Sequence, residues 1–215
     1  GTPLGAGKEA EVYAYRDGWV IKLTRWRRDH APARREDAIL RALASTGLAP
    51  AAGGVAEIGG RWGVVMERIA GPALAERLAA PGGEAVVLET MVALQRAVHA
   101  HAAPSGLLPL KARLCRNILA ARLLDEPTRR RLLDALGGLP DGSRLCHGDF
   151  HPYNIIGTIE APVIIDWLDA TQGNPAADAC RTYLILLLNV PDFATAYLDA
   201  YIHHSGHSRA ALLEW

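Results

Sequence analysis

The feature that most constrains this chain is the polar segment HGDFHPYN at residues 147–154. Within it, Asp149 follows a His by two positions and precedes Asn154 by five. A carboxylate on a rigid loop can accept the proton of an attacking hydroxyl group, and an Asn amide oxygen a few residues later can bind Mg²⁺. This spacing indicates a catalytic loop, and it is the most specific motif in the chain.

A second carboxylate follows the apolar run 163–165, twelve residues after Asn154. A buried strand that ends in a carboxylate delivers a hard oxygen ligand, so Asp166 is predicted to share a Mg²⁺ ion with Asn154. An alternative is a zinc cluster made by His147, Asp149 and His151. That alternative leaves Asn154 and Asp166 without a role, so we favour the magnesium hypothesis.

The N-terminal part carries features suited to phosphate groups. Gly5 and Gly7 lie in a predicted strand-loop-strand segment, where glycines let backbone amides approach phosphates closely. Lys22, between apolar residues of the next strand, points to the face opposite Ile21 and could neutralise phosphates. Glu36, on the following helix, could hold Lys22 by an ion pair. Arg35 and Asp37 stand beside Glu36 and leave that choice open.

The pattern along the chain predicts two parts. Residues 1–70 read mainly as strands, with hairpins around Asp17-Gly18 and Gly59-Gly60 and a helix over 32–46. Gly71-Pro72 is a break, and residues 71–215 are mainly helical. In this second part we expect helices over 84–101, 112–124, 127–137, 175–189 and 193–203, and strands over 144–146, 154–156 and 163–165. His99 and His101 are expected at the exposed end of the long helix 84–101.

Composition excludes several classes of protein. Hydrophobic residues make up 50% of the 215 residues, and the formal net charge is zero, which argues against disorder and against a nucleic-acid partner. The chain has no run of 18 apolar residues, so no membrane-spanning segment is predicted. Its three cysteines form no CxxC pair, and the simplest expectation is a reducing, cytoplasmic location.

Taken together, these segments resemble the aminoglycoside phosphotransferase and choline kinase family, which is related to the protein kinases. HGDFHPYN is similar to the family's catalytic loop, and IIDW at 164–167 to its metal-binding segment, where protein kinases show DFG. GKEAEVYAY at 7–15 with VIKL at 20–23 resembles the nucleotide loop and the lysine strand. VMERIAG at 65–71 resembles the hinge between lobes, and GNPAAD at 173–178 the stretch after the metal segment.

The resemblance implies an α+β, bilobal protein-kinase-like fold: a small β-rich nucleotide-binding lobe over 1–70, and a larger helical lobe over 71–215 with the catalytic loop and acceptor site. It implies a phosphotransferase that moves the γ-phosphate of ATP or GTP, with Mg²⁺, to a hydroxyl of a small molecule. The implied roles are as follows: catalytic base, Asp149; metal ligands, Asn154 and Asp166; phosphate contacts, Gly5, Gly7 and Lys22 with its partner Glu36; adenine contacts, the Glu67 carbonyl and the Ile69 amide. His147 would brace the loop, and Asp178 would anchor the helical lobe.

Two questions stay open at this level. Residues 150–215 hold seven acidic and two basic residues, a balance of −5, which favours a cationic acceptor such as an amino sugar or amino alcohol. A kinase-like fold can also retain a nucleotide and lose turnover, so the alternative is a weakly active or inactive nucleotide-binding module. A protein kinase is disfavoured because DFG and an APE-like segment are missing. The pattern does not predict the oligomeric state.

Overall fold

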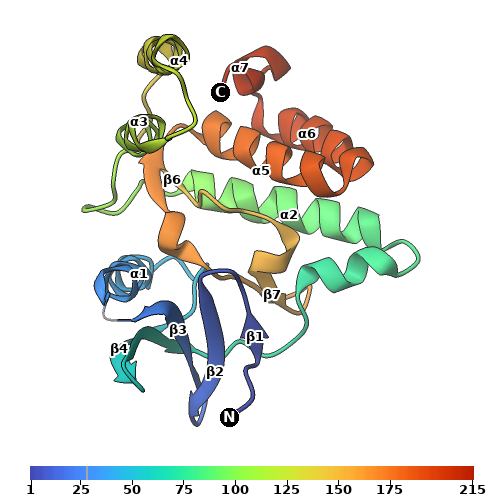
Figure 1. Ribbon diagram of the computed structural model, residues 1–215. Helices are drawn as coiled ribbons and strands as arrows, with labels where there is room; N and C mark the ends of the chain where they lie inside the picture. Colours follow the sequence, from blue (N-terminus) through green and yellow to red (C-terminus); the bar gives the residue numbers. More distant parts are fainter. Residues whose placement is uncertain (28) are drawn as a thin grey trace. The chain divides into compact units, whose positions relative to one another are not determined.

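The computed structural model describes residues 1–27 and 29–215. Its contacts divide the chain into two compact units (Figure 1). The first consists of Gly1–Glu76 and Tyr153–Leu168, and the second of Arg77–Pro152 and Asp169–Trp215. The first unit is rich in strands and the second is mainly helical, which confirms the predicted α+β class. The first unit extends beyond residue 70 and takes in a later segment, and the assignment of nucleotide binding to it stays a prediction.

A five-stranded antiparallel sheet forms most of the first unit, with the strand order β1-β2-β3-β5-β4. The bounds are β1 Gly5–Ala6, β2 Ala10–Arg16, β3 Trp19–Arg27, β4 Ala52–Ile58 and β5 Arg61–Glu67. Both predicted hairpins are confirmed. The turn residues Gly18, Gly59 and Gly60 have φ values of 71°, 58° and 74°. Glycine adopts such positive φ values without steric cost, so these turns set the register of the sheet.

One helix, α1 (Ala31–Ala42), lies between β3 and β4 in the chain and packs on the sheet. It ends four residues before the predicted end at residue 46. Residues 43–46 form turns instead, and the Thr46 hydroxyl donates a hydrogen bond of 2.7 Å to the Leu43 carbonyl. Threonine side chains that bond to nearby backbone compete with the helical ladder, which accounts for the early end.

The segment 153–168 joins the first unit as a hairpin of β7 (Ile155–Gly157) and β8 (Pro162–Ile164). The Ile164 amide donates to the Leu48 carbonyl at 2.9 Å, and the Gly157 amide donates to the Pro72 carbonyl at 3.2 Å. A side chain at Gly71 would meet the backbone of Gly157 at 2.9 Å, so the two glycines allow this close approach. The sequence motif that ends in Asp166 is thereby fixed to the same unit as the sheet.

Helices dominate the second unit. Their bounds are α2 Gly83–Ala100, α3 Leu110–Ala120, α4 Glu126–Gly138, α5 Pro175–Asn189, α6 Pro191–Ser205 and α7 Arg209–Leu213. Helix α6 packs on α2 and α5. The side chains of Val87 and Met91 on α2 and of Tyr197 and Leu198 on α6 are buried. Two short strands, β6 (Arg144–Cys146) and β9 (Thr171–Gly173), pair antiparallel. β6 leads directly into the predicted catalytic loop.

The structure corrects one expectation about the long helix. His99 lies in the last turn of α2 but is buried, while His101, just beyond the helix, is half-buried. The position of His99 continues the buried face formed by Val87, Met91 and Gln95, at the spacing of four residues that brings side chains onto one face of a helix. Within the described residues, no helix is both long enough and apolar enough to cross a membrane.

Candidate active site

The first unit places Lys22 between two carboxylates. Its Nζ atom lies 3.0 Å from Oε1 and 3.1 Å from Oε2 of Glu36, and 2.7 Å from Oδ1 of Asp166. Lys22 is on β3, Glu36 is on α1, and Asp166 follows β8. The neighbouring carboxylate, Asp37, instead bonds to Arg41 and to the Gly54 amide, so the structure selects Glu36 as the partner of Lys22.

The two carboxylates keep Lys22 charged. Burial lowers the pKa of the Lys22 ammonium, but Glu36 and then Asp166 outweigh burial and raise the pKa above its usual value. The partners differ in exposure, because the Glu36 side chain is 4% exposed and that of Asp166 is 41% exposed. Glu36 is therefore the buried partner of Lys22. Asp166 keeps an open side on which another ligand can bind.

Asp166 has an unusual backbone conformation. Its φ is 61°, and among the described residues it is the one non-glycine residue with a positive φ. Asp tolerates this region better than most residues, yet the conformation still costs free energy and persists only where the surroundings hold it. The ion pair with Lys22 supplies such a hold. Strained residues of this kind concentrate at functional sites, which supports a role for this carboxylate.

Asn154 lies beside the segment that carries Asp166. The Asn154 carbonyl accepts a hydrogen bond of 2.9 Å from the Ile165 amide. Because Ile155 pairs with Ile164 in the β7–β8 hairpin, Asn154 and Asp166 are located at the same open end of it. The pair offers an amide oxygen and a carboxylate, both hard donors. This donor set fits Mg²⁺, which is commonly held by one or two protein ligands together with substrate phosphates.

The glycine loop is formed by β1 and the start of β2. Gly5 pairs with Val12, and the Gly7 amide donates to the Ala10 carbonyl at 2.9 Å. A side chain at Gly5 would meet nothing within 4 Å, and at Gly7 only the Ala10 carbonyl at 3.8 Å. Contacts within the chain therefore do not require glycine at either position. The hinge residues follow the sheet, since Glu67 ends β5 and Ile69 comes two residues later.

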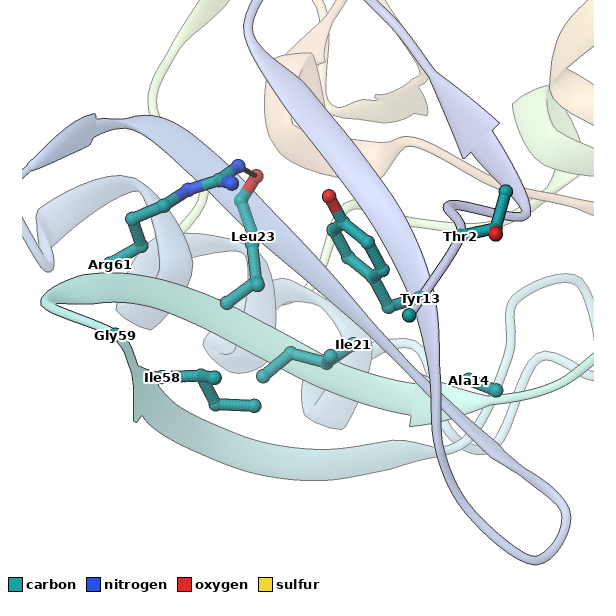
Figure 2. Close-up of a pocket in the computed structure, with 9 residues that line it drawn as sticks. Thr2, Tyr13, Ala14, Ile21, Leu23, Ile58, Gly59 and Arg61 are labelled. Atoms are coloured by element: carbon teal, nitrogen blue, oxygen red, sulfur yellow. Dashed lines mark hydrogen bonds between the residues drawn. The ribbon is translucent and has the colours of Figure 1, made fainter.

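A pocket of about 460 Å³ opens on the sheet (Figure 2). It is lined by Tyr13, Ile21 and Leu23 among others. Ile21 and Leu23 flank Lys22 in β3, so their side chains point to the opposite face from the lysine. The pocket and the Lys22 cluster therefore lie on different faces of one sheet.

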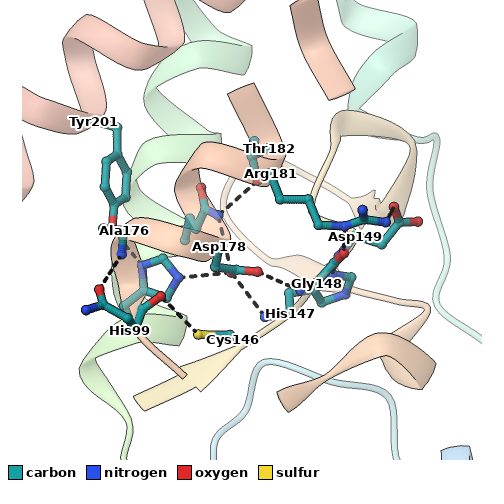
Figure 3. A network of polar contacts seen from close by, with 12 residues as sticks. His99, Cys146, His147, Gly148, Asp149, Ala176, Asp178, Arg181, Thr182 and Tyr201 are labelled. Atoms are coloured by element: carbon teal, nitrogen blue, oxygen red, sulfur yellow. Dashed lines mark hydrogen bonds and ion pairs between the residues drawn. The ribbon is translucent and has the colours of Figure 1, made fainter. Parts of the chain in front are cut away.

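The second unit holds the loop that carries Asp149. Oδ1 of Asp178 accepts a hydrogen bond of 2.7 Å from the Gly148 amide, and Oδ2 accepts one of 3.1 Å from the His147 amide (Figure 3). The Asp149 amide donates to Nδ1 of His147 at 3.2 Å. Gly148 has a φ of 82°, and a side chain there would meet the Asp169 carbonyl oxygen at 2.5 Å. The loop conformation thus requires glycine at position 148.

Basic groups surround the Asp149 carboxylate. Nε2 of His151 lies 3.5 Å from Oδ2, and an Arg181 guanidinium nitrogen lies 3.4 Å from Oδ1. The hydrogen bond from His151 lowers the pKa of Asp149, and the charges of His151 and Arg181 add to this against the opposing effect of burial. Asp149 is therefore ionised at neutral pH, as a residue that accepts a proton must be.

Sequence reasoning missed Arg181 and a second arginine, Arg113. Arg181 donates through Nε to the Gly148 carbonyl, and the Arg113 guanidinium lies 2.5 Å from the Asp169 carboxylate. Arg181 follows Asp178 by three residues, so both are on the same face of α5. That spacing from the GNPAAD motif was a usable signal for Arg181. Arg113 offers no comparable signal, because it reaches Asp169 only through the packing of α3 near β9.

The zinc alternative finds no support in the described part of the chain. The group of three potential metal ligands that gathers there is His99, Cys146 and Asp178 rather than His147, Asp149 and His151. Even that group suits a metal poorly. Burial raises the pKa of the Cys146 thiol, whereas a metal needs the thiolate. Asp178 already bonds to His99 and to two backbone amides.

Solved structures with similar folds were found at low sequence identity. A thermostable mutant of the aminoglycoside phosphotransferase APH(4)-Ia, in a ternary complex with ADP and hygromycin B, is 15% identical with a TM-score of 0.71; the match covers 99% of this chain and 82% of that one. APH(3'')-Id from Streptomyces rimosus, with ADP and streptomycin, is 15% identical with a TM-score of 0.70, covering 99% and 89%. A choline/ethanolamine kinase family protein from Mesorhizobium loti is 20% identical with a TM-score of 0.64, covering 99% and 71%.

These similarities confirm the predicted bilobal protein-kinase-like fold. No curated protein matches the chain in sequence. A family model described as the phosphotransferase enzyme family matches residues 1–215, which confirms the resemblance based on the HGDFHPYN and IIDW segments. Since this match covers the whole chain, the protein belongs to the phosphotransferase enzyme family.

Proposed function

We propose that this enzyme transfers the γ-phosphate of ATP or GTP to a hydroxyl group of a small molecule, with Mg²⁺ as cofactor. The observation that carries the proposal is the Lys22 cluster. A lysine kept charged by a buried Glu36 stands beside Asp166, a partly exposed and strained carboxylate. This is the arrangement expected of a site that binds phosphate groups and a divalent cation together.

In this proposal the first unit binds the nucleotide. Lys22 would contact the α- and β-phosphates, and Gly5 and Gly7 would let backbone amides approach them, since nothing within the chain requires glycine there. The Glu67 carbonyl and Ile69 amide would face the base. Two of the similar structures hold ADP, which supports nucleotide use.

Asn154 and Asp166 would hold the metal ion. When bound, Mg²⁺ supplies positive charge to the phosphate oxygens. In the present structure Asp166 bonds to Lys22 at 2.7 Å, so nucleotide binding would redistribute the contacts of both side chains. Glu36 would keep Lys22 in place during that exchange, because it is almost fully buried.

Asp149 would orient the acceptor and take its proton. The acceptor oxygen forms a bond to the γ-phosphorus, the bond from that phosphorus to the β-γ bridging oxygen breaks, and the nucleoside diphosphate leaves. The hydroxyl proton goes to the Asp149 carboxylate. The transition state of such a transfer is loose, so positioning and charge stabilisation supply most of the rate enhancement.

The acceptor class is the finer part of the proposal. The acidic residues of the last third favour an amino sugar or amino alcohol, and two similar structures hold hygromycin B and streptomycin. Near Asp149, however, both Asp149 and Asp169 are already paired with arginines. An acceptor panel should therefore compare each amino compound with its neutral counterpart, such as glucosamine with glucose and ethanolamine with ethylene glycol.

A thermal-shift titration with ATP and GTP, each with and without Mg²⁺, tests the nucleotide site. Nucleotide at about 100 times its Kd should add about 2.7 kcal/mol of stability, seen as a raised midpoint. Asp166→Ala should abolish the dependence on Mg²⁺, whereas Asp141→Ala, an exposed carboxylate of the second unit, should not. An unchanged metal dependence in Asp166→Ala would contradict its assignment as a metal ligand.

The acceptor panel, followed by release of nucleoside diphosphate, tests the transfer. Acceptor-dependent release supports a kinase. Mg²⁺-dependent nucleotide binding without any release, with or without acceptor, would instead support the inactive nucleotide-binding module.

A further inference from the structure

A buried pair of ionisable side chains in the second unit has no part in the function as proposed so far. Nε2 of His99 lies 2.9 Å from Oδ2 of Asp178, and the two side chains are 6% and 2% exposed (Figure 3). His99 comes from α2 and Asp178 from α5. Burying an ionisable pair is costly unless its remaining donors and acceptors are satisfied. The partners of the pair therefore indicate what it does.

Asp178 uses both of its oxygens to hold the loop that precedes Asp149. Oδ1 accepts from the Gly148 amide at 2.7 Å, and Oδ2 accepts from the His147 amide at 3.1 Å as well as from His99. Gln95 adds a longer contact of 3.4 Å. Burial raises the pKa of Asp178, but the hydrogen bond and charge of His99, together with His147 and the Gly148 amide, outweigh burial and lower the pKa to about 2. The carboxylate is thus ionised and accepts all of these bonds.

The hydrogen bond at the second ring nitrogen of His99 determines which nitrogen carries the proton in the neutral imidazole. Nδ1 lies 2.7 Å from the hydroxyl of Tyr201 on α6. Burial raises the pKa of Tyr201, so the group remains a phenol with a proton to donate. If Tyr201 donates to Nδ1, the neutral imidazole carries its proton on Nε2, and that proton points at Asp178. A protonated imidazole also donates from Nε2, so Asp178 receives this bond in either state.

The loop held in this way has little freedom. Gly148 adopts a φ of 82°, and a side chain there would meet the Asp169 carbonyl oxygen at 2.5 Å. The peptide between His147 and Gly148 donates to one Asp178 oxygen, and the preceding amide donates to the other. Asp149 is the next residue, so the direction of its carboxylate depends on how these peptides are held.

We propose that His99 is a positioning residue for Asp149, which orients the Asp178 carboxylate and through it the backbone that presents the catalytic side chain. The proposal rests on the proposed function of Asp149 as the base. Four elements meet in this connection: α2 with His99, α6 with Tyr201, α5 with Asp178, and the loop after β6. The ring nitrogens of the buried His99 bond to Asp178 and Tyr201, so we assign it no direct contact with nucleotide or acceptor.

The test compares His99→Leu, which removes both hydrogen bonds, with His99→Gln, whose amide can still donate to Asp178 and accept from Tyr201. His101→Gln, a half-buried histidine two residues later, is the matched control. The readouts are the melting midpoint, the KM for the nucleotide, and kcat for release of nucleoside diphosphate with the best acceptor or with water.

In His99→Leu we expect kcat to fall about 10- to 100-fold, since misplacing a reacting group by about 1 Å costs on the order of 100-fold. KM for the nucleotide should stay within about two-fold of the parent value, because the residues proposed to bind it belong to the first unit. His99→Gln should regain most of the lost kcat. Tyr201→Phe, which keeps the bond to Asp178, should lose less than His99→Leu.

Three results would overturn the proposal: kcat within two-fold of the parent in a folded His99→Leu; kcat and KM that worsen together; or a folded His99→Gln no better than His99→Leu. If His99→Leu does not fold, His99→Asn, whose shorter amide cannot keep both hydrogen bonds, takes its place in the same comparison with His99→Gln, and the same three results overturn the proposal. Absence of phosphate transfer in the parent protein would contradict the proposed function itself.

Discussion

The two units differ in how exposed to water a carboxylate is when it lies beside a basic side chain. Each brings a basic side chain against a carboxylate: Lys22 against Glu36 and Asp166 in the first, and His99 against Asp178 in the second. In the first cluster one partner, Asp166, is 41% exposed. In the second, both members of the pair are almost fully buried, and the carboxylate also bonds to two backbone amides.

The difference in exposure suits the two carboxylates to different roles. Asp166 can exchange its hydrogen-bond partners for a ligand, whereas Asp178 keeps the partners it has. An exposed carboxylate can give up a contact to an incoming phosphate or cation, because water and ligand can replace it. A buried carboxylate cannot do so cheaply, since each lost bond leaves a desolvated charge. We therefore expect variants in the Lys22 cluster to change ligand binding, and variants in the His99 cluster to change the geometry of the Asp149 loop.

The largest effect on activity should come from Asp149, the residue whose loop is held by the His99 cluster (His99 and Asp178). Asp149→Asn keeps the size of the side chain but removes its ability to take a proton. Turnover should fall by at least about 10²-fold, the lower end for loss of a general base. Nucleotide affinity, measured by titration, should be unchanged. Turnover within a few-fold of the parent would remove Asp149 from the catalytic role.

Removing the lysine from the Lys22 cluster (Lys22, Glu36 and Asp166) should have the largest effect on stability. Lys22→Met leaves Glu36 buried and without its cation, and removing one partner of a buried pair costs about 3–5 kcal/mol. Nucleotide binding should be lost as well. Urea unfolding measures the stability, and Lys8→Met, an exposed lysine, is the control. If Lys22→Met/Glu36→Leu is no more stable than Lys22→Met alone, the buried pair is not the cause.

The His99 cluster also predicts how the free energy of unfolding depends on pH. The pKa of Asp178 is lowered from 3.8 to about 2 in the folded protein. Its contribution to stability is therefore fully present above pH 4 and is lost as the pH falls from about 4 towards 2. A shift of this size corresponds to on the order of 2 kcal/mol. Urea midpoints at pH 7, 4 and 3 measure the loss.

The matched comparison for this pH dependence is Asp178→Asn against Asp141→Asn. Asp178→Asn should lower stability at pH 7 and flatten the decline below pH 4. The exposed Asp141 has no such buried partners, and its variant should follow the parent curve. An Asp178→Asn protein that still loses the same stability on acidification would place the effect on other carboxylates.

Much of the fold could be predicted because it is encoded locally. The hairpins around Asp17-Gly18 and Gly59-Gly60 follow from residues that adopt positive φ values between alternating strands. Helix α5 begins at Pro175 as predicted, and its start is set by Asn174, whose side chain accepts from the Ala176 amide. In contrast, β9 has three residues and no local signal; it is a strand because β6 pairs with it.

The site divides in the same way. The motifs identified Asp149, Asn154 and Asp166, whose roles stay predictions, because the spacing of chemical groups within one loop or hairpin is a local property. The apolar pattern of the helix does not reveal that His99 is buried, because a buried helix face is recognised from its apolar residues. A polar residue can occupy such a face when distant elements supply its partners, here Asp178 and Tyr201.

The smallest predicted effect concerns the two basic groups that lie beside the Asp149 carboxylate. Both His151 and Arg181 lower the pKa of Asp149, with the His151 hydrogen bond the larger influence. The ionised carboxylate is the active form, so activity should persist as the pH falls through the ordinary range for Asp and decline only below it. Removing either neighbour should raise the pKa of Asp149 and move this acid limb to higher pH.

The relative size of the shifts in the acid limb for the two variants tests whether exposure to water weakens the effect of a neighbouring group on Asp149. His151→Gln should move the acid limb of kcat further than Arg181→Gln, because Arg181 is 52% exposed and water screens its charge. Added salt should shrink the shift caused by Arg181→Gln more than that caused by His151→Gln. If, at high salt, the acid limb shifts further in Arg181→Gln than in His151→Gln, the charge of Arg181 is not the cause. Arg181 would then act on Asp149 through its hydrogen bond to the Gly148 carbonyl.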